Sequence, residues 1–193
     1  MDAIQTYSQN NNLIKGPLLL KPNIFEDERG YFYESWNKKK FNKITQTNFL
    51  QDNHSRSFKG VLRGLHYQLP SKAQEKLIRC TVGKIFDVIV DIRKSSKTFC
   101  DWTFRELSSE NKNQIWIPKG FAHGFLVLSE IAEVQYKTND YWSKEFERSI
   151  KWNDSRLNIK WPLSKIKLKE PILGEKDILA PSLEEAIKQN DIF

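Results

Sequence analysis

The chain has 193 residues, which is long enough for one domain with a substantial hydrophobic core. Its composition is 39% hydrophobic with six Trp, six Tyr and twelve Phe, and this excludes a disordered chain, which could not bury enough apolar surface to offset its ordering entropy. No apolar stretch approaches the roughly 20 residues that cross a bilayer, and the start, MDAIQTYSQNNN, lacks the pattern of a secretion signal.

The net charge of +7 raises the hypothesis of nucleic-acid binding, because clustered Lys and Arg release counterions from phosphates. Here the excess is mostly scattered lysine, as in 38–40 and 160–169. A basic pocket for a small diphosphate ligand needs far fewer charges and agrees with the same composition. We therefore expect no nucleic-acid partner and no membrane partner.

The chain has only two cysteines, Cys80 and Cys100. Neither lies in a CxxC motif or at a Cys/His spacing suited to zinc. This usage predicts a reduced, cytoplasmic protein.

The predicted elements begin with a peripheral helix over 36–44 and continue with short segments of alternating, β-branched and aromatic residues. The predicted strands cover residues 76–82, 84–93, 114–118, 124–128 and 132–138. A last helix is expected over 182–189, where Ser182 and Glu185 form a capping box. Many short strands separated by turn residues predict an all-β protein, an antiparallel sandwich or barrel, in a single domain.

Within 84–93 the two faces of the predicted strand differ. The even positions form an unbroken apolar face, while the odd positions mix Ile85 and Ile89 with Asp87 and Asp91. We expect one face to pack in the core and the other to line a polar cavity.

Three histidines are present, His54, His66 and His123. A lone histidine is more often a structural hydrogen-bonding group than a catalytic one, but His66 and His123 lie in glycine-flanked strand contexts that can expose a side chain into a cavity. A metal site in a β-barrel typically contains a close His-x-His pair, and none occurs. We therefore expect no metal.

Two further candidates for chemistry are Lys76, at the start of an otherwise apolar strand, and Tyr136. By alternation Tyr136 shares a face with Val134 and points inward. The alternative interpretation makes Tyr136 a core aromatic residue and Lys76 a solvated strand end.

Several long motifs occur together in one order. They are FEDERGYFYESWN, FLQDNHSRS, GVLRGLHYQ, KLIRCTVGKIFDVIVDIRKSS, QIWIPKGFAHGFLVLSE, AEVQYKTNDYW, FERSIKWND and EKDILAP. Over residues 17–183 the chain closely resembles the dTDP-4-dehydrorhamnose 3,5-epimerase family. Long motifs in register are far more specific than one short pattern.

The resemblance implies a cupin-like jelly roll that forms homodimers and uses neither metal nor cofactor. It implies one epimerase domain over 1–193, with the jelly-roll core at about 17–165 and a C-terminal extension, 166–193, that contributes Asp177. The implied substrate is dTDP-4-dehydro-6-deoxy-glucose, inverted at C3 and C5 in the formation of dTDP-L-rhamnose.

The implied chemistry requires a base, a cation at the ketone oxygen and an acid on the opposite face of the sugar, because protons beside a ketone are acidic only when the enolate is stabilised. By the resemblance His66 is the base and Asp177 orients its imidazole. Lys76 faces the developing oxyanion, and Tyr136 is the proton donor.

The same register implies a set of substrate-binding residues that carry donors for a diphosphate, acceptors for hydroxyls and faces for a base. These are Phe25, Arg29, Phe32, Glu34, Gln51, Asp52, Asn53, Arg63, Lys76, His123, Trp142, Glu147 and Lys176. Trp142 stands where the family often has a tyrosine that stacks on thymine, and an indole can stack as well.

One pair of these residues makes a geometric demand. A regular strand places Arg63 and His66 on opposite faces, whereas the resemblance requires both in the pocket. Gly64 offers a bulge that would reconcile them.

Three alternatives remain open at this point. One is a monofunctional 3-epimerase of a related 4-keto-6-deoxy sugar nucleotide with the same base and acid, and another is a ketoisomerase on the same scaffold. The third, from a different class, is a non-catalytic jelly roll that binds sugar nucleotides. Such a module would have little reason to contain His66, Tyr136, Lys76 and Asp177 together.

Overall fold

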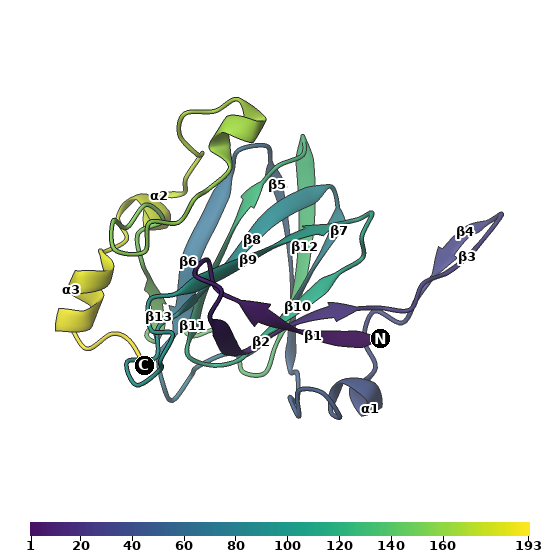
Figure 1. Ribbon diagram of the computed structural model, residues 1–193, viewed down its shortest axis with the longest axis horizontal. Coiled ribbons are helices and arrows are strands. Elements are labelled where there is room, and N and C mark those ends of the chain that lie inside the picture. Colours follow the sequence, from purple (N-terminus) through teal and green to yellow (C-terminus); the bar gives the residue numbers. More distant parts are fainter.

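The computed structural model describes residues 1–193 and consists mainly of two antiparallel sheets that face each other (Figure 1). The larger sheet has six strands, in the spatial order β1 (Asp2–Tyr7), β2 (Leu13–Lys21), β10 (Gln114–Ile117), β7 (Lys76–Val82), β12 (Ile131–Thr138) and β5 (Gln51–Phe58). The smaller has five, in the order β13 (Glu147–Ser149), β6 (Leu62–Gln68), β11 (Phe121–Val127), β8 (Lys84–Asp91) and β9 (Trp102–Ser108). This arrangement confirms the predicted antiparallel β-sandwich.

The sequence pattern located the central strands well. The strand predicted over 76–82 is β7, and those predicted over 84–93, 114–118, 124–128 and 132–138 are β8, β10, β11 and β12 with ends shifted by a few residues. In each, apolar side chains alternate against the facing sheet, which is the signal that the sequence carries.

Helices are few and short: α1 (Lys38–Phe41), the 3₁₀ turn η1 (Leu163–Ile166), α2 (Glu175–Ile178) and α3 (Leu183–Lys188). The capping box predicted for the last helix is present, since the Ser182 hydroxyl accepts from the Glu185 N–H and the Glu185 carboxylate accepts from the Ser182 N–H. The helix predicted over 36–44 has only one turn, capped by the Asn37 side chain. No helix is long and apolar enough to span a membrane.

Two apolar clusters cover opposite faces of the five-stranded sheet. The cluster between the sheets includes Ile85, Ile89 and Phe125, and the cluster on the outer face includes Val88 and Val90 under residues 150–193. Strand β8 is therefore buried on both sides, and on its odd-numbered face Ile85 and Ile89 pack in the core while Asp87 and Asp91 are buried polar groups. The C-terminal segment is held against the sandwich by this packing, and it carries α2 toward the end of β6.

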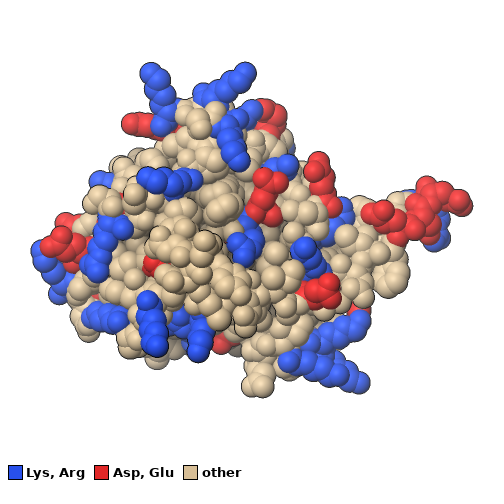
Figure 2. Space-filling model, viewed as in Figure 1, with Lys and Arg blue, Asp and Glu red and all other residues tan.

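The hairpin of β3 (Phe25–Asp27) and β4 (Gly30–Phe32) departs from this layered arrangement. It forms a separate two-stranded sheet and projects from the body of the protein beyond the ends of β2 and β10 (Figure 1). All of residues 25–32 are exposed, and charged side chains gather at the tip (Figure 2).

Candidate active site

A small cavity of about 100 Å³ opens at one end of the sandwich, where side chains from both sheets converge. Its lining comes from β5, β6, β7, β12, β13 and the connections between them, namely Gln51, Asn53, His66, Tyr67, Gln68, Gln74, Lys76, Tyr136, Trp142 and Glu147. Seven of these ten residues belong to the set that the sequence resemblance implied. The cavity is therefore the candidate active site.

His66 on β6 is paired with a carboxylate from the C-terminal segment. Its Nε2 lies 2.6 Å from Oδ1 of Asp177 on α2, and the same oxygen accepts from the Gly64 N–H at 3.3 Å. Because Nε2–H donates to the carboxylate, Nδ1 carries the free lone pair that can take up a proton. Burial lowers the pKa of His66 below its ordinary value, although Asp177 opposes this, so the imidazole is neutral at neutral pH.

The approach of His66 to this position depends on a bulge in β6. In the pairing with β11, Arg63 lies opposite Phe125 and His66 opposite His123, so two residues of β6 face the single Gly124. Gly64 has a φ of 123°, and a Cβ there would lie 2.4 Å from the Cα of Gly124. The predicted bulge is therefore present, and it brings residues three apart to one face of the strand.

Lys76, the first residue of β7, supplies a cation beside the histidine. Its Nζ donates to the His66 carbonyl oxygen at 3.4 Å. Burial and the neighbouring Lys176 lower the pKa of Lys76 to about 8, so the ammonium is close to titration in the neutral range. A cation in such a desolvated position can stabilise an oxyanion strongly.

Tyr136 reaches the cavity from the other sheet. It lies on β12, packs with the cluster that contains Val134 as predicted, and is opposite Asn53 in register. Burial raises the pKa of its phenol, with Arg63 acting in the opposite direction, so the hydroxyl is protonated and can donate. The imidazole and the phenol thus approach one space from two facing sheets.

Glu147, Lys176 and Trp142 form the rim on the side of α2. Lys176 Nζ lies 2.6 Å from Oε1 of Glu147. Burial raises the pKa of Glu147, but Lys176 and the Trp142 indole together hold it below the ordinary value, so the carboxylate is ionised. This ion pair links Lys176, which directly precedes Asp177, to β13.

His123 lies directly across the strand ladder from His66, on β11. Its Nε2 is 2.8 Å from Oδ2 of Asp87, whose other oxygen is buried without a hydrogen-bond partner. His123 and Asp87 are both buried behind the cavity.

Other residues implied by the resemblance lie elsewhere in this chain. Phe25, Arg29 and Phe32 are in the projecting hairpin, where Arg29 bonds Asp27 at 2.5 Å, and Glu34 pairs with Lys40 just beyond it. Asp52 points to the outer face of the six-stranded sheet, where it pairs with Lys137 at 2.9 Å.

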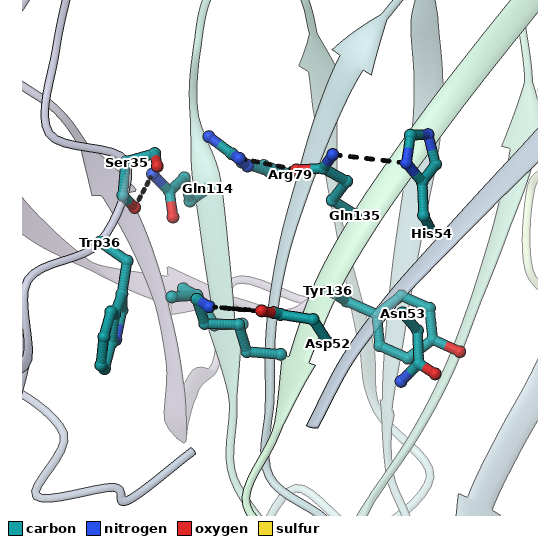
Figure 3. A pocket seen from close by; sticks show the side chains of 11 residues that line it. Ser35, Trp36, Asp52, Asn53, His54, Arg79, Gln114, Gln135 and Tyr136 are labelled. Carbon is teal, nitrogen blue, oxygen red and sulfur yellow. Dashed lines mark hydrogen bonds and ion pairs between the residues drawn. The ribbon is translucent and has the colours of Figure 1, made fainter. Parts of the chain in front are cut away.

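That outer face has a second hollow, of about 340 Å³, which shares Asn53 and Tyr136 with the cavity (Figure 3). A row of side chains crosses it, in which Arg79 donates to Gln135 at 2.6 Å and Gln135 lies 3.4 Å from Nδ1 of His54. His54, the third histidine, therefore belongs to a different surface from His66.

The sequence analysis did not select three lining residues, Tyr67, Gln68 and Gln74. For Gln68 a signal was present, because it follows His66 by two positions on one strand and so shares its face. The pairing of Asp87 with His123 connects neighbouring strands and is not visible in either motif alone.

A neutral imidazole held by a carboxylate, a protonated phenol on the facing sheet and a partly buried ammonium beside the imidazole form a proton-transfer site. Proton removal on one side and return on the other inverts a carbon centre, which is the chemistry of an epimerase. The fold and the site therefore define the class as a jelly-roll epimerase, an isomerase.

Comparisons with known proteins identify the family. Residues 11–185 match the sequence profile described as dTDP-4-dehydrorhamnose 3,5-epimerase. The Shigella flexneri protein of that name is 56% identical over 163 residues, which cover 83% of this chain and 87% of the relative. The chain belongs to the dTDP-4-dehydrorhamnose 3,5-epimerase family.

Solved structures agree with this assignment and with the predicted cupin-like jelly roll. A dTDP-6-deoxy-D-glucose-3,5-epimerase from Legionella pneumophila, crystallised with dTDP-4-keto-L-rhamnose, matches with a TM-score of 0.88 and 44% identity, covering 99% of this chain and 96% of its own. A 3'-monoepimerase from Streptomyces bikiniensis, in complex with dTDP-quinovose, matches with a TM-score of 0.86 and 29% identity, covering 93% and 89%.

Proposed function

We propose that this chain inverts C3 and C5 of dTDP-4-dehydro-6-deoxy-glucose, as a dTDP-4-dehydrorhamnose 3,5-epimerase in dTDP-L-rhamnose formation. The observation that carries the proposal is the placement of His66 and Tyr136 on facing sheets around one cavity. The similarity to named 3,5-epimerases, which reaches 56% identity, supports inversion at two carbons, because the match to the monoepimerase is only 29% identical.

The first step begins at a carbon next to the C4 ketone. His66 Nδ1 takes the proton from C3, and the C–H electron pair moves to form the C3–C4 double bond while the ketone oxygen becomes an oxyanion. Asp177 stabilises the imidazolium that results, and Lys76 stabilises the enolate oxygen.

The second step returns a proton to the opposite face. Tyr136 donates its phenolic proton to C3 as the enolate collapses to the ketone, which inverts the centre. After His66 has released its proton to solvent and the Tyr136 phenolate has taken one up, repetition at C5, the other carbon next to the ketone, gives the doubly inverted sugar. Lys76 serves both rounds, because the same C4 oxygen carries the charge each time.

Substrate binding is assigned to side chains at the rim of the cavity. Arg63, which acts on the pKa of Tyr136, and Lys176, which pairs with Glu147, provide cations for the diphosphate. Gln51 and Asn53 provide partners for hydroxyls and the pyrimidine edge. Trp142, half-exposed at the rim, provides an indole face for the base.

A homodimer is part of the proposal, and the projecting hairpin supports it. Phe25 and Phe32 are 66% and 68% exposed and lie outside the cavity of their own chain, together with Arg29. Exposed aromatic side chains on a projecting arm are typical of a surface that docks on a partner. We assign these residues, with Glu34, to the nucleotide site of a second copy related by twofold symmetry.

Two further assignments belong to this proposal. We place the protein in the cytoplasm, which agrees with the free thiols of Cys80 and Cys100. We treat residues 1–193 as one epimerase domain in which the segment after 166 delivers Asp177 to the site.

The test is proton NMR of the purified protein with dTDP-4-dehydro-6-deoxy-glucose in deuterium oxide, following the C3 and C5 signals. We expect solvent deuterium at both carbons, and the product with both centres inverted. Exchange at C3 alone would overturn the double inversion in favour of a 3-epimerase. Binding without any exchange would overturn catalysis altogether.

A further inference from the structure

The connection between β12 and β13 is the least regular part of the proposed nucleotide-binding rim. Residues 139–146 form this loop without a helix or strand of their own, and they carry Trp142. The Trp142 side chain is 55% exposed, so packing fixes it only in part. A stacking residue binds a base best when its backbone is held before the ligand arrives.

One buried side chain holds this loop on both sides of the tryptophan. Gln68 is 3% exposed, and its Oε1 accepts from the Ser143 N–H at 2.7 Å. Its Nε2 donates to the Tyr141 carbonyl at 3.2 Å and to the Lys72 carbonyl at 2.6 Å. Both amide hydrogens are used, and the backbone groups on either side of Trp142 bond to one carboxamide.

The contact is directional and difficult to replace. A carboxamide alone among neutral side chains offers an acceptor and two donors in one plane, which is what a loop N–H and two carbonyls require. The Trp142 N–H adds a longer bond to Oε1 of Gln51, at 3.3 Å. With Gln68 removed, the Tyr141 carbonyl and the Ser143 N–H lose their bonds to it, while the bond of the Trp142 N–H to Gln51 remains.

Gln68 connects the strand that carries His66 with the loop that carries Trp142. It lies on β6 two residues after His66, so the strand that carries the base also carries the anchor of the loop. Its bond to the Lys72 carbonyl ties the connection between β6 and β7 into the same arrangement.

We propose that Gln68 is a positioning residue for nucleotide binding, which acts by fixing Trp142 through the Tyr141 and Ser143 backbone. This rests on the proposed function in one respect, the assignment of Trp142 to the base. The hydrogen bonds of the Gln68 carboxamide all go to backbone groups of the two connecting loops, so we assign its effect to affinity for the nucleotide and not to the chemical step.

The test is calorimetric binding of dTDP together with steady-state kinetics for Gln68→Met, which keeps side-chain length and removes all three bonds. We expect dTDP to bind about tenfold more weakly and KM to rise, with kcat changed less than about twofold. Lys72→Met is the matched control, because it removes only a 42%-exposed lysine that pairs with Asp140 of the same loop. Its dTDP affinity should equal that of the wild type.

A double-mutant cycle tests whether Gln68 affects dTDP binding through Trp142. If Gln68 acts through Trp142, then Gln68→Met should weaken binding little further in a Trp142→Ala background. Additive losses, or normal dTDP binding by Trp142→Ala, would overturn this route. Deuterium exchange at C3 and C5 tests the proposed function separately, so the two failures can be distinguished.

Amide hydrogen exchange of the wild-type protein gives a second measurement that does not depend on whether the variant folds. The Ser143 amide is bonded to a buried oxygen and should exchange slowly, whereas the solvent-facing amides of the same loop should exchange fast. Fast exchange at Ser143 would overturn the proposal.

Discussion

The cavity and the projecting hairpin each contain a group of the residues that the resemblance implied, and the two regions differ in exposure and in packing. In the cavity, His66, Lys76 and Tyr136 lie on strands that are paired along their length and packed between sheets. In the hairpin, Phe25 lies on a short strand that is bonded only to its partner strand, Arg29 lies in the turn between the two, and both residues are exposed.

The proposed function gives these two regions different tasks. Groups that transfer protons must be held within a fraction of an ångström, and a sandwich provides that rigidity. Groups that bind a nucleotide tolerate more freedom and can arrive from a neighbouring chain. The following predictions test this division, beginning with the largest expected effect.

Removal of the base should abolish chemistry while leaving the fold in place. For His66→Ala we expect deuterium incorporation at C3 and C5 to fall by roughly a thousandfold, because proton abstraction is the first step. NMR in deuterium oxide measures it. His54→Ala, on the outer face of the six-stranded sheet, is the control, and unchanged exchange in His66→Ala would remove the imidazole from the mechanism.

Removal of the acid should separate the two steps. For Tyr136→Phe we expect inversion to fall by roughly a hundredfold, while deuterium wash-in from the original face persists, because the phenol acts only on reprotonation. The measurement is the ratio of exchange to inversion at each carbon. Loss of exchange together with inversion would assign Tyr136 to the first step or to binding.

Shortening a hairpin side chain should weaken substrate binding and leave turnover nearly unchanged. For Arg29→Ala we expect KM to rise about tenfold with kcat nearly unchanged. Mixing this variant with His66→Ala under conditions that exchange subunits should raise kcat/KM at low substrate concentration. The reason is that a mixed dimer then contains one site with both an intact His66 and an intact Arg29. Failure of the mixture to gain activity would show that the hairpin serves its own chain or no site.

The pH dependence of kcat/KM should depend on the ionisable groups of the cavity and not on those of the hairpin. We expect kcat/KM to rise with pH through a pKa below 6.5, as His66 loses its proton, and to fall near pH 8, as Lys76 loses its charge. Asp177 raises the pKa of His66, so Asp177→Asn should move the acid limb to lower pH. In Arg29→Ala both limbs should stay in place, and a shift of either would mean that the hairpin contributes to the electrostatics of the base.

Much of the sandwich could be predicted from local patterns. Strand β7 was predicted to the residue, because alternation and a following Gly83 define it within a few positions. The capping box at Ser182 was equally local. Strands β1 and β2 were not predicted, since Gly16 and Pro17 interrupt the second of them and only the pairing between the two makes them strands.

Residues of the candidate site could be predicted from the sequence only where a recognisable motif contains them. Gly64 pointed to a bulge from sequence alone, and the pairing with β11 confirmed it. Gln68 was missed because its partners are backbone groups of two loops, one of them more than 70 positions away. No side-chain pattern records a bond of that kind.

The place of Asp177 in the chain order has a consequence for synthesis in the cell. It follows all thirteen strands, so a ribosome completes the residues of both sheets before it adds the carboxylate that orients His66. A chain that ends before Asp177 therefore contains the residues of both sheets but lacks the carboxylate that orients its base. Translation itself delays epimerisation until the protein is nearly complete.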